Sequence, residues 1–329
     1  MKLGNVTGDI YDRSIHKKLN SRRRGVENGA AYGEDCAVFS VDFNAEKVAV
    51  AQAQAVYSGK ECGKYAVYAA VNQAAVFGVR NPIGVLLNIL LPAETGEQEL
   101  RRIVEDAQAA ADALGTAIAD VKASVTAAVN APVLSATAVG TTAGMFKKSG
   151  KMAENGQIVM TKWAGLEGSA ILASRCFDRL RERYPSHLLE EAAGFGRMLS
   201  VLPEAAAAGK SGVSALCAAA EGGIFRALWT LAQRAGVGLE IDLKKIPIRQ
   251  ETVEICNYLD LNPYELAGNG SLLCITAHGE TLLKELQREK IPAAIIGMAT
   301  ANNDKVIVNG EEKRFLEPAK MDEIYKILK

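Results

Sequence analysis

Short β-prone runs and longer alanine-rich stretches alternate along the first half of the chain. Two of the β-prone runs, CAVFSV at 36–41 and KVAVA at 47–51, are separated by the polar residues Asp42, Asn44 and Glu46. Runs of this kind, interrupted by turn-forming residues, are typical of strands. The pattern therefore predicts two neighbouring strands joined by a polar turn.

A helix is predicted after these strands. The alanine-rich stretch 63–77 has the length and composition of a largely buried helix, and Gly78 followed by Pro82 supplies a stop signal. Three further elements are predicted in this half: a buried strand at 83–91 closed by Pro92, an amphipathic helix at 97–114 closed by Gly115, and a strand at 132–140.

A turn-rich stretch from Lys147 to Gly156 divides the chain near its middle. After it the same alternation restarts, with strands expected at 157–161, 236–242, 271–276 and 293–297 and helices expected from about 167, at 221–235 and at 279–290. A chain of 329 residues also exceeds one typical core. We therefore expect a mixed α/β (α+β) protein of two domains, residues 1–147 and 148–329.

The charges of the chain balance, with 38 basic and 38 acidic residues. No net field attracts nucleic acid or an anionic membrane surface, so neither is expected as a partner. The N-terminal residues lack the apolar run of a signal peptide, and no stretch of about 18 consecutive apolar residues suggests a membrane span. These features predict a cytoplasmic protein.

The cysteines and histidines do not form a recognisable metal or disulfide pattern. The chain has three histidines and six cysteines without a C-x-x-C pair, namely Cys36, Cys62, Cys176, Cys217, Cys256 and Cys274. Free cysteine is most often a small buried residue. A zinc site or a disulfide framework is therefore not expected.

Several local strings, in order along nearly the whole chain, resemble the aminoimidazole-ribonucleotide (AIR) synthase superfamily. Its members include thiamine-monophosphate kinase, selenophosphate synthetase and the hydrogenase-maturation dehydratase, and the likeness is greatest to the hydrogenase-maturation branch. The strings that carry the resemblance are Gly33–Val38, Glu61–Lys64, Val71–Gly78, Ala128–Val133, Met160–Gly168, Glu221–Ile224 and Gly236–Ile241.

The resemblance implies an AIR synthase-like fold. It implies an N-terminal domain that pairs with a second copy to form a shared barrel, and a C-terminal α/β domain beside it. It also implies ATP and Mg²⁺ as cofactors, because the relatives transfer phosphoryl groups and need carboxylates to hold the metal against the polyphosphate.

The chain departs from the family pattern where those carboxylates are expected. Gln54 stands at the position of an Asp after the second strand, and the Asn-Asp pair of the first helix reads Asn72-Gln73. A glycine-rich nucleotide loop of the family reads Asp120–Ser124, and the His-Asp-x-Thr element before Glu221 reads Cys217–Ala220. A neutral side chain cannot replace the charge of a metal-binding carboxylate.

The residues that still match the family supply the candidate site. The candidate metal ligands are Asp35, Glu61 and Asp120, and the candidate cofactor-binding residues are Asp35, Lys64, Asn72, Lys162, Glu221, Gly222 and Gly223. Each also has a structural interpretation: Asp35 as a cap, Lys64 as a solvated lysine, and the acid before Gly222 as a partner of a helix dipole.

Three hypotheses about function remain open. The first is a homodimeric family member with weakened or lost ATP-dependent catalysis, which binds a nucleotide or small metabolite, or which partners an active paralogue. The second is a working ATP-dependent kinase or dehydratase whose Mg²⁺ site uses Asp35, Glu61 and Asp120. The third is a structural dimerisation subunit. Dehydration of a carbamoyl group on its own tail is not expected, because the sequence ends Tyr325–Lys329 without cysteine.

Overall fold

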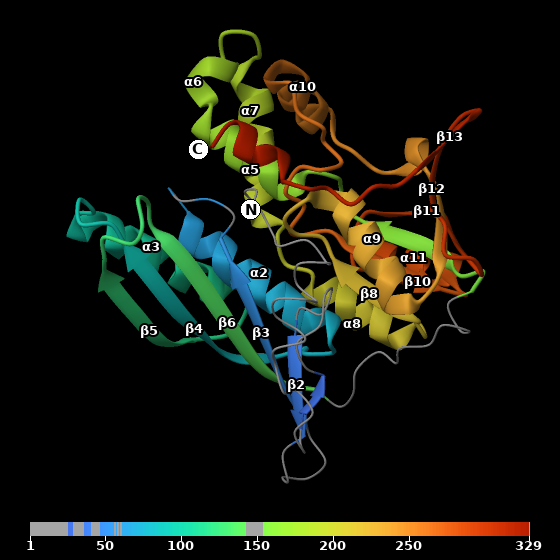
Figure 1. Cartoon of the computed structure of the whole chain (residues 1–329), viewed down its shortest axis with the longest axis horizontal. Helices are drawn as coiled ribbons and strands as arrows, with labels where there is room; N and C mark the ends of the chain where they lie inside the picture. The colour runs from blue at the N-terminus through green and yellow to red at the C-terminus, as the bar shows by residue number, and fades with distance from the viewer. Residues whose placement is uncertain are drawn as a thin grey trace. The chain divides into compact units, whose positions relative to one another are not determined.

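The computed structural model describes residues 26–28, 36–40, 47–55, 57, 59, 61–142 and 154–328. These residues fall into two compact units, one ending at Thr142 and the other beginning at Glu154. The predicted domain boundary after residue 147 lies outside the described residues, so its position stays a prediction. Each unit contains its own sheet and its own helices (Figure 1).

The first unit is a six-stranded sheet with the strand order β1-β2-β3-β6-β4-β5. Its strands are β1 (Val26–Asn28), β2 (Cys36–Ser40), β3 (Lys47–Gln54), β4 (Pro82–Leu91), β5 (Ile118–Val125) and β6 (Val133–Thr142), and its helices are α2 (Cys62–Val76) and α3 (Glu97–Ala113). Strands β4 and β5 pair in parallel because α3 connects them as a crossover, whereas the other described pairs are antiparallel.

Helix α2 packs along β3 and β6, and α3 packs beside it. Small residues make this layer thin, since the strand residues beneath α2 are largely alanines such as Ala51 and Ala136. The two helices also approach closely at Gly63, where a Cβ atom would lie 2.1 Å from the carbonyl oxygen of Ile103. The alanine and glycine content of the sequence is thus used for close packing of helix on helix and helix on sheet.

The opposite side of this sheet, which we call the open face, carries partly exposed side chains. Strand register aligns them in rows across β3, β6, β4 and β5. One row is Gln54, Ser135, Asn88 and Lys122, the next is Gln52, Thr137, Leu86 and Asp120, and Leu90 and Val133 lie beyond the first row. Alternation along each strand therefore separates a buried helix side from a mixed polar and apolar open face.

The second unit is a seven-stranded sheet with the order β13-β12-β9-β11-β7-β10-β8. Its strands are β7 (Gln157–Thr161), β8 (Ala215–Ala218), β9 (Gly238–Asp242), β10 (Leu272–Thr276), β11 (Ala293–Thr300), β12 (Lys305–Asn309) and β13 (Glu312–Phe315). Its helices are α5 (Leu166–Arg175), α6 (Phe177–Leu180), α7 (Ser186–Gly194), α8 (Leu202–Lys210), α9 (Gly223–Ala235), α10 (Gln250–Leu259) and α11 (Gly279–Arg288), with short 3₁₀ turns η2 (Phe195–Arg197), η3 (Leu243–Lys245) and η4 (Glu323–Lys326).

The apolar stripe of α9 supplies much of the core of this unit. Leu228 and Leu231 of α9 pack with Leu273 and Ile275 of β10, all of them almost fully buried. Helices α8 and α11 also contact the sheet, and every residue of β10 is buried. Helices α5, α7 and α10 pack together as a separate group. A central strand covered in this way explains the uninterrupted apolar run of its sequence.

Most elements predicted from the hydrophobic pattern are confirmed within a few residues. One interpretation is wrong: Asp120–Ser124, matched to a family loop, lies inside strand β5 at the edge of the first sheet. Within the described part of the chain, no helix has the length and apolarity needed to cross a membrane.

Candidate functional site

The start of helix α2 brings two of the predicted residues together. Glu61, which precedes the helix, has a left-handed backbone (φ 65°), and Lys64 Nζ donates a hydrogen bond to Glu61 Oε1 at 2.5 Å. The backbone N–H of Glu61 donates to Asp106 Oδ2 of α3 at 3.0 Å. Sequence reasoning missed Asp106, because only the packing of α3 on α2 brings the two acids together.

This cluster contains two carboxyl groups, those of Glu61 and Asp106, and one ammonium group, that of Lys64. Burial raises the pKa of the Asp106 carboxyl, and the neighbouring Glu61 charge raises that pKa further, while the Glu61 N–H bond and Lys64 lower it. Burial likewise raises the pKa of the Cys62 thiol at the first helical position. The ammonium group of Lys64 in this cluster is already bound to Glu61.

The neutral amides lie on two different elements. Asn72 is buried in α2, and the side-chain Oε1 of Gln73 is buried with no hydrogen-bond partner in the described part of the chain. Gln54 ends β3 on the open face, two residues after Gln52, whose Nε2 donates to Ser135 Oγ at 3.1 Å. A buried amide oxygen without a hydrogen-bond donor is uncommon, and the described surroundings of Gln73 supply no donor to its Oε1.

The predicted metal ligands do not converge among the described residues. Asp35 lies outside those residues. Asp120 is exposed on β5, where its Oδ1 accepts the Val121 N–H at 2.9 Å and its Oδ2 lies 3.5 Å from Lys122 Nζ. Glu61 lies before α2 and is bound to Lys64. No group of three or more His, Cys, Asp or Glu side chains in the described ranges is placed to hold a metal ion.

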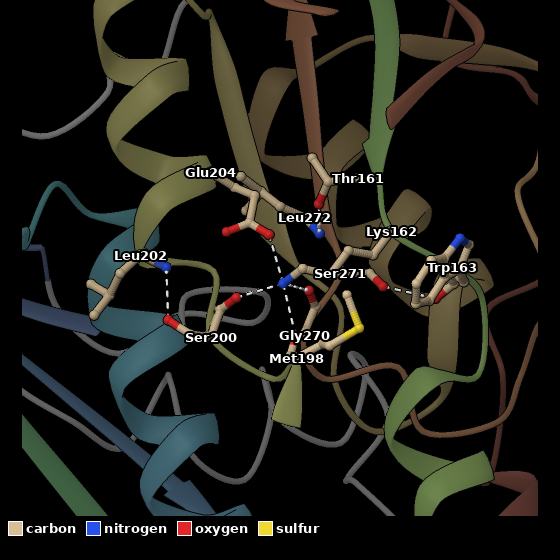
Figure 2. Close-up of polar contacts among 10 residues, drawn as sticks. All are labelled: Thr161, Lys162, Trp163, Met198, Ser200, Leu202, Glu204, Gly270, Ser271 and Leu272. Atoms are coloured by element: carbon tan, nitrogen blue, oxygen red, sulfur yellow. Dashed lines mark hydrogen bonds and ion pairs between the residues drawn. The ribbon is translucent and has the colours of Figure 1, made fainter. Parts of the chain in front are cut away.

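In the second unit, Lys162 follows β7 and turns its side chain into the protein. Figure 2 shows the ammonium among three backbone carbonyls and the carboxylate of Glu204. Nζ donates to the oxygens of Met198 (2.8 Å), Ser200 (2.6 Å) and Gly270 (2.9 Å), and lies 2.6 Å from Glu204 Oε1. A lysine has three N–H donors, so this arrangement uses all of them inside the protein.

Burial dominates the electrostatics of this pair. The Lys162 side chain is 7% exposed and that of Glu204 is 1% exposed. Burial lowers the pKa of the Lys162 ammonium and raises the pKa of the Glu204 carboxyl, while their mutual attraction opposes both shifts. A direct contact between Lys162 and a ligand stays a prediction, and such a contact requires one of these internal bonds to break.

Glu221, Gly222 and Gly223 form the entry to helix α9. Both glycines have left-handed backbones, with φ 82° and φ 63°, and a Cβ atom on Gly223 would lie 2.6 Å from the carbonyl oxygens of Tyr264 and Leu266. Only glycine satisfies both the backbone conformation and this close approach. The expected helix start is therefore confirmed, two residues later than predicted, at Gly223.

The loop 267–271 connects these two parts of the predicted site. Gly270 accepts from Lys162, the Gly268 N–H donates to the carbonyl oxygen of Ala220 at 3.1 Å, and Ser271 Oγ donates to that of Trp163 at 2.8 Å. Sequence reasoning did not single out this loop, although its Gly-Asn-Gly run was a signal for tight backbone geometry. The structure thus joins Lys162 and Glu221–Gly223 through one shared loop.

Two family models match the chain, and together they cover most of it. Residues 27–142 match the N-terminal domain of AIR synthase related proteins, and residues 154–309 match the C-terminal domain. Among curated relatives, the carbamoyl dehydratase HypE of Rhodobacter capsulatus is 29% identical over 254 residues, which span 75% of this chain and 72% of that protein. The HypE of Azotobacter vinelandii is 26% identical over 258 residues, which span 76% of this chain and 73% of that protein.

Solved structures share the fold across nearly the whole length. A HypE–HypF complex gives a TM-score of 0.68 at 19% identity, covering 94% of this chain and 99% of that chain. HypE in complex with ATP gives a TM-score of 0.63 at 19% identity, covering 98% of this chain and 97% of that chain. AaThiL complexed with AMPPCP and TMP gives a TM-score of 0.70 at 17% identity, covering 95% of this chain and 100% of that chain. With both domains matched in order, the chain belongs to the AIR synthase-related family, in its HypE-like branch.

Proposed function

We propose that this chain is a hydrogenase-maturation-factor-like protein whose ATP-dependent catalysis is weakened or lost. It binds a nucleotide or small metabolite, or it partners an active paralogue. The relatives described above as carbamoyl dehydratases, and the neighbours solved with ATP or AMPPCP, support an ancestral nucleotide site. The proposal concerns what this chain's own residues retain of that site.

The proposal rests on which residues stand at the positions expected to hold Mg²⁺ and on what those residues contact. Two of the expected positions are the amides Gln54 and Gln73, and the described acids Glu61 and Asp120 each lie against a lysine. Magnesium needs charged oxygen ligands within about 2.1 Å, and transfer of a phosphoryl group needs the metal to neutralise developing charge. The described acids do not suit that task.

Strand register adds a geometric reason. Gln54 and Asp120 lie on the same open face, but β6 and β4 separate their strands. Three spacings between neighbouring strands amount to roughly 14 Å. Even an acid restored at position 54 cannot share one ion with Asp120 of the same chain, because both ligands must lie next to the metal.

Isothermal titration with ATP, with and without Mg²⁺, tests the proposal. We expect nucleotide binding that is absent or that changes less than about threefold when Mg²⁺ is added, and we expect no ADP formation. Micromolar binding that requires Mg²⁺, together with turnover, contradicts the proposal.

The alternative is an active kinase or dehydratase with a rearranged metal set of Asp35, Glu61 and Asp120. The exposure of Asp120 on the open face favours it, since an exposed carboxylate is accessible to a ligand. In that case Asp35→Asn abolishes ADP production from candidate acceptors. Unchanged ADP production in this variant eliminates the alternative.

We also propose that the open face pairs two copies of the chain. Leu86 and Val133 on this face are 40% and 41% exposed, and exposed apolar surface rimmed by polar residues is typical of protein–protein interaction sites. A second copy covers them and leaves the flanking amides and hydroxyls to pair across the interface. A heterodimer with an active paralogue uses the same surface, and a purely structural subunit is the limiting case in which pairing is the whole function.

A further inference from the structure

Strand β5 leaves a long backbone edge free on the first sheet. In the described part of that sheet β5 pairs only with β4, whereas the opposite edge is the three-residue strand β1. The eight residues of β5 contain no proline, and all of them except Ile118 and Val121 are exposed. A free strand edge of this length is a template for pairing with another strand.

Hydrogen bonds show which backbone groups of β5 point to this edge. The N–H of Thr126, just after the strand, donates to the carbonyl oxygen of Leu91 on β4 at 2.9 Å. Because backbone groups alternate along a strand, and β5 keeps a regular register from Asp120 onward, the even-numbered residues face β4 and Val121 faces the free edge. The Val121 N–H accordingly donates to Asp120 Oδ1 at 2.9 Å instead of to β4.

The side chains on either side of this N–H carry opposite charges. Asp120 and Lys122 flank Val121 on the open face, 48% and 77% exposed, with Asp120 Oδ2 3.5 Å from Lys122 Nζ. In an antiparallel pair of two β5 strands whose two-fold axis passes at Val121, residue 120 of each copy lies opposite residue 122 of the other. Both of these cross-strand pairs join an acid to a base, so the strand is complementary to itself in this register.

We propose that two copies of the chain join edge to edge through β5, in the antiparallel register that places Val121 opposite Val121 of the second copy. The Val121 N–H then donates to the Val121 carbonyl oxygen of the second copy. The Asp120 carboxylate, which caps that N–H in the single chain, moves to Lys122 of the second copy. The inference rests on the proposed pairing of two copies, and it adds which strand joins them and in which register.

Edge pairing also accounts for how the open face is covered. A two-fold axis perpendicular to the sheet places the open faces of both copies on the same side of the joined sheet. That sheet contains six described strands from each copy, and twisted sheets of more than about ten strands curl. Curling toward the open side brings the exposed Leu86 and Val133 of the two copies toward each other.

Charge reversal tests the register, because positions 120 and 122 meet each other across the two-fold axis. Sedimentation equilibrium of the full-length protein over a dilution series measures the dissociation constant of the dimer. Asp120→Lys opposes two bases in both cross-strand pairs, and Lys122→Asp opposes two acids. Each variant should therefore raise the dissociation constant at least about tenfold. Lys122→Asp retains the carboxylate that caps Val121, and circular dichroism checks that both variants are folded.

Mixing the two variants is the decisive arm of the experiment. An equimolar mixture of Asp120→Lys and Lys122→Asp, one of them fluorescently labelled, restores both acid–base pairs and should form a heterodimer within about threefold of the wild-type dissociation constant. The double variant that carries both substitutions should recover the same value. Lys313→Glu is the matched control, because it reverses one member of an exposed cross-strand pair with Glu240 in the second sheet, and it should leave the constant unchanged.

The outcomes separate this inference from the pairing on which it rests. A wild-type protein that stays a single chain throughout the dilution series overturns both. A wild-type dimer that neither reversal weakens, or a mixture that fails to restore association, overturns pairing through β5 and leaves association through the open face standing. A weakened dimer in Lys313→Glu also overturns the assignment, because the effect is then a general one of surface charge.

Discussion

At the scale of single residues, the buried pair Lys162–Glu204 makes internal contacts that the sequence match does not predict. The string around Lys162 matches the family, and a lysine in such a string is a natural candidate for a ligand contact. Its ammonium is instead bound by three carbonyls and Glu204 (Figure 2). Sequence reasoning cannot foresee this, because the acceptors come from 36, 38 and 108 residues away.

Removing the Lys162 ammonium should destabilise the second unit strongly. Lys162→Met leaves the buried Glu204 and three carbonyls without their donor, and we expect a loss of about 3–5 kcal/mol in unfolding free energy. Urea unfolding followed by tryptophan fluorescence measures this unit alone, since both tryptophans, Trp163 and Trp229, lie in it.

The double variant Lys162→Met with Glu204→Leu is the control. It removes both buried charges, so we expect it to recover at least about 1 kcal/mol of the loss, although the three carbonyls still lack a donor. If Lys162→Met costs less than about 1 kcal/mol, the ammonium is not the structural centre of these loops.

At the scale of elements, the hydrophobic pattern predicted much of the fold. Helix α2, helix α3 and strand β4 begin and end within about two residues of the predicted bounds, because each has the length and composition typical of its element and a glycine or proline close to its end. Strand β5 was not predicted, since an edge strand exposed on both faces has no alternation to detect. Helices α7 and α10 also went unpredicted, and packing with α5 accounts for their formation.

The entry to helix α9 gives the prediction at this scale. Gly223→Ala forces a Cβ atom to within 2.6 Å of two carbonyl oxygens on a left-handed backbone, so we expect a loss of about 2–4 kcal/mol by the same urea measurement. Gly212→Ala is a matched control, because Gly212 also has a left-handed backbone (φ 65°) but no atom within 4 Å of the added Cβ.

The control isolates the close approach from the backbone strain. Gly212→Ala should cost about 1 kcal/mol, the penalty for the left-handed conformation alone. Equal losses in the two variants would mean that the loop carrying Tyr264 and Leu266 moves freely, and the tight contact would then have no energetic role.

At the scale of the whole molecule, the family and its two-domain organisation could be predicted from strings spread over the chain. The arrangement within the site could not be predicted, because Asp106 and Asp322 reach their partners across 45 and 100 residues. Neither acid belongs to a local string: Asp106 accepts the backbone N–H of Glu61, and Asp322 accepts those of Gly222, Ala267 and Ile324. Strand register likewise placed Gln54 and Asp120 on one face, which no local pattern contains.

Association through the open face gives the prediction at this scale. Leu86→Asp places a charge at the centre of the proposed interface, and light scattering should show the mass falling from two chains to one with unchanged circular dichroism. Met298→Asp changes a residue of similar exposure, 49%, on the second sheet and should leave the mass unchanged. Retention of the dimer by Leu86→Asp would contradict the proposed interface.

The central claim is that amides in place of carboxylates have weakened metal-dependent use of ATP. The most direct measurement compares Mg²⁺-dependent ADP release by the wild type with that of a Gln54→Asp, Gln73→Asp double variant. The account predicts no detectable release from the wild type. It also predicts that the factor by which Mg²⁺ raises ATP affinity is at least about tenfold larger in the double variant than in the wild type. Mg²⁺-dependent turnover by the wild type, abolished rather than improved by these substitutions, would contradict it.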